Sequence, residues 1–181
     1  MKTHKSLAAT KRLSLSAILS AIGVILLYVG SIIDILSLTM VSIAALIVYF
    51  AVIELRGKYP LMIYGVTAFL SVLLLPEKTG PICYLLFGGC YPILKVALEK
   101  LPKWLAYPLK LLCFNAAAVL ILWLTAALLH VPQEEGMLYQ IGLVVCANIA
   151  FLLLDFLMTQ LTRLYYFKFR KLLGVGKYLG S

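Results

Sequence analysis

Charged residues are scarce in this sequence of 181 residues, because Asp, Glu, Lys and Arg together make up only 13% of it. Soluble domains carry about 25% charged residues and are about half apolar. Here 64% of the residues are hydrophobic and the mean hydropathy is +1.04. A water-soluble core of this size could not enclose so much apolar side-chain surface. The composition therefore excludes an ordinary soluble domain and indicates a lipid environment.

Sequence motifs of catalysis are also absent. The chain has no Gly-rich phosphate loop and no Walker signature, so we expect that it does not hydrolyse ATP itself. It has no HExxH motif, no G-x-S-x-G motif and no cluster of histidines. None of the cysteines forms a CxxC pair, which argues against a zinc site or a redox motif: Cys83, Cys90, Cys113 and Cys146. We therefore expect a protein that is not an enzyme and that uses no metal and no cofactor.

Long apolar runs, in contrast, fill most of the chain. A helix that spans a bilayer needs about 20 predominantly apolar residues. Six stretches qualify, at residues 13–33, 35–55, 59–75, 82–98, 109–131 and 137–161. They predict an all-α membrane protein, a bundle of about six transmembrane helices. Residues 1–12 would form a basic cytoplasmic N-terminus, residues 13–161 the transmembrane domain, and residues 162–181 a basic-aromatic cytoplasmic tail.

The first span needs one distinction. A basic segment followed by an apolar run resembles a signal peptide, but no convincing A-x-A cleavage site precedes a soluble domain here. We interpret residues 13–33 as an uncleaved span.

The distribution of lysine and arginine gives the predicted bundle an orientation. Cations in short loops stay on the cytoplasmic side of a membrane. If the N-terminus is cytoplasmic, every one of the 16 lysines and arginines lies on that side except Lys78. The predicted outer turns contain Asp34, Glu77, Glu134 and Glu135 instead. We therefore expect a multi-pass protein of the cytoplasmic membrane with both termini inside. This topology explains the net charge of +9 without nucleic acid as a partner.

The tail combines aromatic residues with cations around Arg163, Tyr165 and Lys168. Tyrosines favour the headgroup level of a bilayer, and each cation attracts anionic lipid by about 1 kcal/mol. We interpret the tail as an interfacial extension that contacts the lipid bilayer. A partner-binding role is the alternative.

Asp155 is the clearest charged residue inside a predicted span, about 10 Å from its cytoplasmic end at 1.5 Å per residue. Asn148 and Thr159 lie seven residues before it and four residues after it, on the same helix face. Asn115 and Lys95 lie at a similar depth in two other spans. We predict that these five residues form an intramembrane polar cluster built around a Lys95–Asp155 ion pair.

This cluster has two interpretations. It could be a proton or cation site. The chain would then be a proton-coupled carrier that uses Asp155. The alternative, which we favour, is a structural clasp that holds three spans together. Lys95 could also extend its ammonium group to the cytoplasmic surface instead.

An imported solute would first bind on the outer side. The polar and aromatic residues predicted there give a candidate substrate-binding set of Tyr28, Asp34, Tyr84, His130, Tyr139 and Gln140. These residues form no specific motif. A histidine such as His130, which follows a long apolar run, is more often an interfacial cap than a ligand.

The first span carries small residues at helical spacing. Ser16, Ser20 and Gly23 share one face, with Ala17 and Ala21 beside it. Small residues four positions apart allow helices to approach closely. The stripe is either an internal packing seam or a docking face for another membrane protein.

Six spans, cytoplasmic termini and an alanine-rich first span make this chain resemble the substrate-binding S components of energy-coupling-factor transporters. In that family an AxxxA pattern on the first span contacts a shared transmembrane coupling subunit. Ala17 and Ala21 match this pattern and would be the partner-docking residues. The resemblance covers the whole chain in architecture, although its motif is only two residues. The chain also resembles small uncharacterised bacterial membrane proteins. The polar residues in the inner half depart from the family pattern, which holds its vitamin in the outer half.

The resemblance implies a solute-binding subunit of a micronutrient uptake transporter. Partner ATPase subunits would supply the energy through the coupling subunit, because this chain carries no ATPase motif of its own. The alternative is a membrane scaffold or assembly protein that transports nothing, in which Asp155 belongs to a structural polar clasp.

Overall fold

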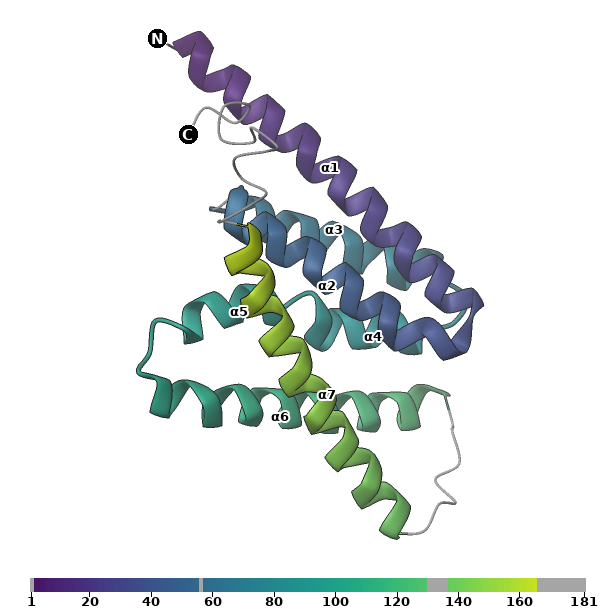
Figure 1. The fold of residues 1–181 in the computed structure, drawn as a ribbon. Coiled ribbons are helices and arrows are strands. Elements are labelled where there is room, and N and C mark those ends of the chain that lie inside the picture. Colours follow the sequence, from purple (N-terminus) through teal and green to yellow (C-terminus); the bar gives the residue numbers. More distant parts are fainter. Residues whose placement is uncertain (1, 56, 130–136, 166–181) are drawn as a thin grey trace.

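The computed structural model describes residues 2–55, 57–129 and 137–165, and all regular elements in these ranges are helical. Figure 1 shows α1 (Lys2–Ile32), α2 (Ser37–Glu54), α3 (Tyr59–Leu74), α4 (Thr79–Cys83), α5 (Tyr91–Leu98), α6 (Lys103–Leu129) and α7 (Met137–Leu164). A 3₁₀ turn, η1 (Asp34–Leu36), precedes α2, and a π-helical segment, η2 (Tyr84–Gly88), follows α4. The predicted all-α class is confirmed for the described residues.

Five helical segments are long and apolar enough to cross a membrane: Ala9–Ile32, Ser37–Glu54, Thr79–Leu98, Trp104–Thr125 and Val144–Leu164. The sixth predicted span corresponds to α3, which is apolar but has only 16 residues. At 1.5 Å per residue α3 is about 24 Å long, shorter than a hydrocarbon core of about 30 Å. The predicted apolar helices are therefore present in the expected order, and α3 is shorter than the others that were predicted to span a membrane.

The predicted span at residues 82–98 is not one regular helix, which corrects the sequence-based expectation. The π-helical segment η2 and a turn at Gly89 and Cys90 separate α4 from α5. The backbone bends where a side chain at Gly89 would collide with neighbouring rings: an added Cβ would lie 2.3 Å from Cδ2 of Tyr64 and 2.8 Å from Cζ of Tyr84. The Tyr64 hydroxyl donates to the Leu85 carbonyl at 2.7 Å, which satisfies a backbone group of the irregular segment.

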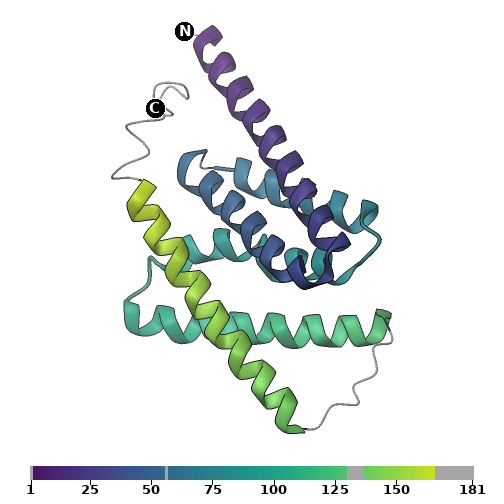
Figure 2. The ribbon, with the colours of Figure 1, turned by 45° about the vertical axis from the view of Figure 1, so that its right-hand side comes forward.

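Helix α2 lies at the centre of the molecule. In both views α1 lies along α2 and α3, while α7 crosses α6 (Figures 1 and 2). Ala44 and Val48 of α2 belong to a core cluster shared with α1 and α3. Ala45 and Tyr49 belong to a second cluster shared with α5 and α7. Helix α2 thus packs both against α1 and α3 and against α5 and α7.

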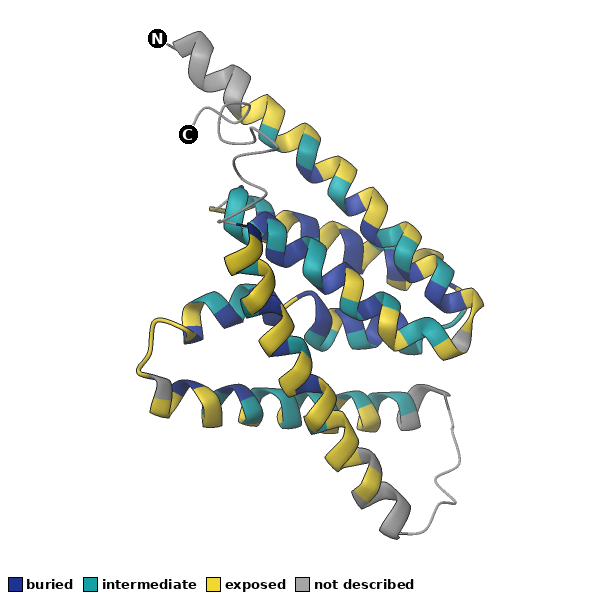
Figure 3. Cartoon of the chain, viewed as in Figure 1, coloured by how far each residue is buried: buried dark blue, intermediate teal, exposed yellow. Residues whose placement is uncertain are grey.

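The surface is apolar, and many buried side chains are polar. Trp104 is 88% exposed and Phe69 is 68% exposed, whereas Lys95 and Thr67 are completely buried. Figure 3 shows exposed residues along the outer faces of α1 and α7. Large exposed apolar patches and buried charges both depart from the pattern of soluble proteins. The described helices are therefore compatible with a multi-pass membrane protein.

Candidate functional site

A buried charge cluster lies where α5, α6 and α7 meet. Its helices present their members at intervals of four residues, which places them on one face. Tyr91 and Lys95 lie on α5, with Glu99 directly after its end, and Asp155 and Thr159 lie on α7. Lys110 of α6 completes the group, which we call the Asp155 cluster: Tyr91, Lys95, Glu99, Lys110, Asp155 and Thr159.

The carboxylate of Asp155 is the centre of the cluster. Its Oδ1 accepts hydrogen bonds from the Tyr91 hydroxyl at 2.5 Å and from Nζ of Lys95. Nζ of Lys110 lies 3.1 Å from Oδ1 and 3.0 Å from Oδ2. Two ammonium groups and one hydroxyl therefore surround a single buried carboxylate.

Lys95 is the most enclosed charge of the cluster, because none of its side chain is exposed. Besides the carboxylate of Asp155, Nζ donates to the Asp155 carbonyl at 3.0 Å and to the Thr159 hydroxyl at 3.0 Å. It also lies 3.0 Å from Oε1 of Glu99. Burying an ammonium group is tolerated only when its donors are satisfied, and these contacts satisfy them.

Glu99 balances the charge of the cluster. Its Oε1 lies 3.0 Å from Nζ of Lys95 and 3.5 Å from Nζ of Lys110. Together with Asp155 it brings two negative charges to two positive ones. The Glu99 side chain is 40% exposed, while those of Lys110 and Asp155 are 7% and 9% exposed. Glu99 is thus the open edge of an otherwise enclosed, electrically neutral group.

The two asparagines form a separate pair. Nδ2 of Asn115 donates to Oδ1 of Asn148 at 2.9 Å, and Nδ2 of Asn148 donates to Oδ1 of Asn115 at 3.1 Å. Asn148 lies seven residues before Asp155, about 10 Å along α7. The side chain of Asn115 contacts Leu111 and Asn148. The five residues predicted as one intramembrane cluster thus lie in two polar groups, with Asn115 and Asn148 in the second.

Aromatic rings lie between these polar groups. Phe151, one turn before Asp155, stacks on Phe114 with ring centroids 4.6 Å apart. Phe87 contacts both of these rings and stacks on Tyr91 at 4.8 Å. Such ring contacts add to the packing energy of the helices. The result is a packed apolar layer beside the Asp155 carboxylate, in which Tyr91 joins the ring stack to the charges.

Sequence reasoning found the Lys95–Asp155 ion pair and the contact with Thr159, but missed Lys110, Tyr91 and Glu99. Tyr91 and Glu99 precede and follow Lys95 by four residues, so helical spacing around Lys95 was a usable signal. Lys110 was assigned to the cytoplasmic edge of a span that was expected to begin at residue 109. Helix α6 begins at Lys103 instead, which places Lys110 two turns inside it.

The predicted substrate-binding residues have different environments. Tyr28 is 49% exposed, and Tyr84 is 1% exposed within the core shared by α1, α2 and α3. The side chain of Asp34 and all of His130 lie outside the described residues. Tyr139 and Gln140 belong to the backbone of α7, but their side chains are not among those described. Within the set, described side chains are thus available for Tyr28, which is half-exposed, and for Tyr84, which is buried.

The predicted partner-docking residues lie on a different face of α1 from the packed one. Ser16, Ser20 and Gly23 are buried, and a Cβ on Gly23 would lie 3.0 Å from Cγ2 of Thr67 on α3. Ala17 and Ala21 are exposed. The serine face is therefore an internal packing seam, and the alanine face is exposed.

Charged side chains stabilise the turn between α3 and α4. Nζ of Lys78 donates to the carbonyls of Val72 at 2.9 Å and Leu75 at 2.5 Å, at the end of α3. The Glu77 carboxylate accepts from the backbone N–H groups of Thr79 at 2.6 Å and Gly80 at 3.2 Å, at the start of α4. The single cation predicted outside thus caps a helix end.

The ion pairs of the Asp155 cluster connect α5, α6 and α7. Among the described residues no group of three or more histidine, cysteine or acidic side chains could hold a metal ion. No family model, curated protein or solved structure matches this chain significantly.

Proposed function

We propose that this chain is an integral protein of the cytoplasmic membrane that crosses the bilayer six times with both termini inside. Many large apolar side chains are exposed, and several charged side chains are buried, which is the reverse of the pattern in soluble proteins. This supports the proposal, because exposed rings such as that of Trp104 suit lipid better than water. The N-terminal part of α1 and the ends of α2 and α7 lie toward the same end of the molecule (Figures 1 and 2). The lysine and arginine distribution assigns that end to the cytoplasm.

Cysteine labelling tests this topology. All four native cysteines would be replaced, and one cysteine would be introduced at Pro76 or at Lys100. An impermeant maleimide should label the first variant in intact cells and the second only after permeabilisation. The opposite pattern would contradict the orientation, and labelling of both in intact cells would contradict the intervening span.

Within that membrane, the chain acts as the solute-binding subunit of a micronutrient uptake transporter that is energised by partner ATPase subunits. The observation that supports this role is the division of α1 into two faces. One face packs on α3 through Ser20 and Gly23, while Ala17 and Ala21 remain exposed. An alanine face of this kind allows another membrane helix to approach closely, as the resemblance to S components implies.

A docking experiment tests the role. The tagged chain would be purified from its native membrane in mild detergent, and co-purifying ATPase subunits would be identified by mass spectrometry. Ala17→Leu and Ala21→Leu should remove these subunits without lowering the stability of the chain, because both positions are exposed. Ala147→Leu and Ala150→Leu, at exposed alanines of α7, are matched controls that should retain them. Absence of ATPases from the wild-type preparation in several detergents would contradict the proposal.

The second candidate is a membrane scaffold or assembly protein that transports nothing. The contacts of the Asp155 cluster favour it, because Oδ1 of Asp155 already accepts from Tyr91, Lys95 and Lys110. A carboxylate with these partners suits a structural clasp better than a site that takes up and releases a cation. The transport subunit and the scaffold would differ in the molecules that co-purify with them. The scaffold would co-purify with membrane proteins but without ATPases and without a small solute.

A further inference from the structure

Exposed aromatic side chains on α6 mark two levels along this helix. Trp104 is 88% exposed and Trp123 is 66% exposed, and these are the two tryptophans of the chain. They lie 19 residues apart, which corresponds to about 28 Å of helix at 1.5 Å per residue. The hydrocarbon core of a bilayer is about 30 Å thick, and tryptophan is enriched at both of its interfaces with water. The distance between the two rings therefore matches the two interfaces of one membrane.

The exposed aromatic residues of the described ranges differ in depth according to their chemistry. Tyr107 is exposed one turn after Trp104, and Tyr28 is half-exposed four residues before the end of α1. Phe156, which has no polar group, is exposed eight residues before the end of α7. Rings with a polar tip suit the boundary between lipid and water, whereas a phenyl ring suits the hydrocarbon.

Helix α1 gives a similar distance between two such levels. No charged residue lies between Arg12 and Tyr28, which are 16 residues apart, or about 24 Å along the helix. An arginine beside the cytoplasmic headgroups and a tyrosine at the outer interface suit these positions.

The ion pair between Lys110 and Asp155 supports the cytoplasmic level. Nζ of Lys110 lies 3.0 Å from Oδ2 of Asp155. Trp104 precedes Lys110 by six residues, so at most about 9 Å of helix separates them. Arg163, which is exposed in the last turn of α7, follows Asp155 by eight residues, or at most about 12 Å. From their shared ion pair, α6 and α7 thus reach a tryptophan and an arginine at similar distances.

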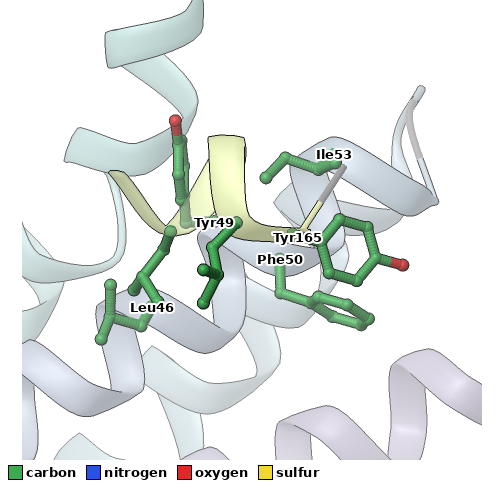
Figure 4. A pocket seen from close by; sticks show the side chains of 7 residues that line it. Leu46, Tyr49, Phe50, Ile53 and Tyr165 are labelled. Atoms are coloured by element: carbon green, nitrogen blue, oxygen red, sulfur yellow. The ribbon is translucent and has the colours of Figure 1, made fainter. Parts of the chain in front are cut away.

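Tyr165 brings a further aromatic ring to the end of α7. Its ring meets that of Phe50 edge to face, with centroids 5.4 Å apart, beside a small apolar groove between α2 and α7 (Figure 4). The Tyr165 hydroxyl donates to Oε1 of Glu54, the last residue of α2, at 2.7 Å. The ends of α2 and α7 therefore combine an apolar ring with a polar tip, as is typical of a membrane interface.

We infer that Trp104 and Trp123 lie at opposite lipid–water interfaces of the membrane, with Trp104 on the cytoplasmic side. The partner of this surface is a bilayer with a hydrocarbon core of about 28 Å. The inference rests on the proposed membrane location and goes beyond it, because the span of α6 then consists of residues 104–123 instead of the predicted residues 109–131. Lys110 then lies within the hydrocarbon, where its contacts with Asp155 and Glu99 replace those with water.

Tryptophan fluorescence tests this inference. Trp104→Phe and Trp123→Phe each leave one native tryptophan, and both changes replace an exposed ring. The full chain would be reconstituted in phosphatidylcholine vesicles whose acyl chains carry bromine either near the headgroup or near the chain end. Bromine quenches a tryptophan that lies at its own depth. In both variants the remaining tryptophan should lose more of its emission to the shallow bromine than to the deep one.

Phe156→Trp, made in the chain without both native tryptophans, is the matched control. Its ring is exposed well inside α7, so it should lose more emission to the deep bromine. If Trp123 is quenched more by the deep bromine, the inferred span is wrong, while the membrane location stands. If neither bromine quenches either native tryptophan, the inferred span and the membrane location are both wrong.

Discussion

Lys110 of α6 lies within 3.1 Å of both carboxylate oxygens of Asp155 on α7, while Lys95 of α5 contacts the same carboxylate. One acidic side chain therefore joins three helices. Because these charges are buried, each depends on the others for its stability. The consequence is a group in which the loss of one member leaves another without a partner.

The first prediction concerns Asp155→Asn. This change removes the negative charge between two buried ammonium groups, and breaking a buried ion pair in this way costs about 3–5 kcal/mol. We expect a loss of that size in the free energy of unfolding, measured by denaturant titration of the purified chain in detergent micelles. Gln160→Leu, at an exposed position on the same helix, is the control that should be nearly neutral. Unchanged stability of the Asp155→Asn variant would show that the cluster is no clasp.

The second prediction uses the charge balance of the cluster. Lys110→Met should destabilise the chain, because Asp155 and Glu99 then face Lys95 alone. Adding Glu99→Gln removes the surplus negative charge, so the double variant should be more stable than the sum of the single effects predicts. We expect a coupling of about 1 kcal/mol, within the usual range for residues of one network.

A double-mutant cycle on the unfolding free energies measures this coupling. The matched cycle combines Lys110→Met with Gln160→Leu and should show none. Additive effects of Lys110→Met and Glu99→Gln would mean that Glu99 does not balance the buried charges.

The third prediction concerns the asparagine pair. Asn148→Leu leaves the amide of Asn115 without its partner on α7. Hydrogen bonds between membrane helices contribute about 0.6 kcal/mol on average, so we expect a loss of that order. Asn115→Leu combined with Asn148→Leu should be less destabilising than the two single changes together, because no orphan amide remains. Additivity of the unfolding free energies would contradict a specific pair.

The fourth prediction concerns the bend between α4 and α5. A methyl group at Gly89 would lie 2.3 Å from a ring carbon of Tyr64, so Gly89→Ala must displace that ring. Overpacking of this kind costs about 1–3 kcal/mol. Gly65→Ala on α3 is the matched control, since an added Cβ there meets no atom within 4 Å. Thermal unfolding should separate the two variants; equal melting temperatures would contradict the close packing of Gly89.

Hydropathy was sufficient to predict most of the apolar helices, because five of the helical segments are long apolar runs. It could not predict the bend at Gly89, where the backbone packs against Tyr64, a residue distant in the sequence. The Lys95–Asp155 pair was predictable from depth alone, since an isolated buried charge requires a partner.

Lys110 could not have been found from the sequence, because helices α6 and α7 cross each other (Figures 1 and 2). The Asn115–Asn148 contact lies at one point of their interface. Lys110, five residues before Asn115, reaches Asp155, seven residues after Asn148. The depth of a residue within a span does not show which residues of two helices face each other. The prediction from the sequence therefore placed all five polar residues in one cluster.

The proposed function requires that the chain binds a small solute for uptake. Native mass spectrometry of the intact chain, purified from its own membrane in mild detergent, tests it most directly. We predict a bound small molecule that is not a phospholipid and that dissociates on unfolding. Preparations that contain only the bare chain and its phospholipid adducts would contradict solute binding and favour the scaffold.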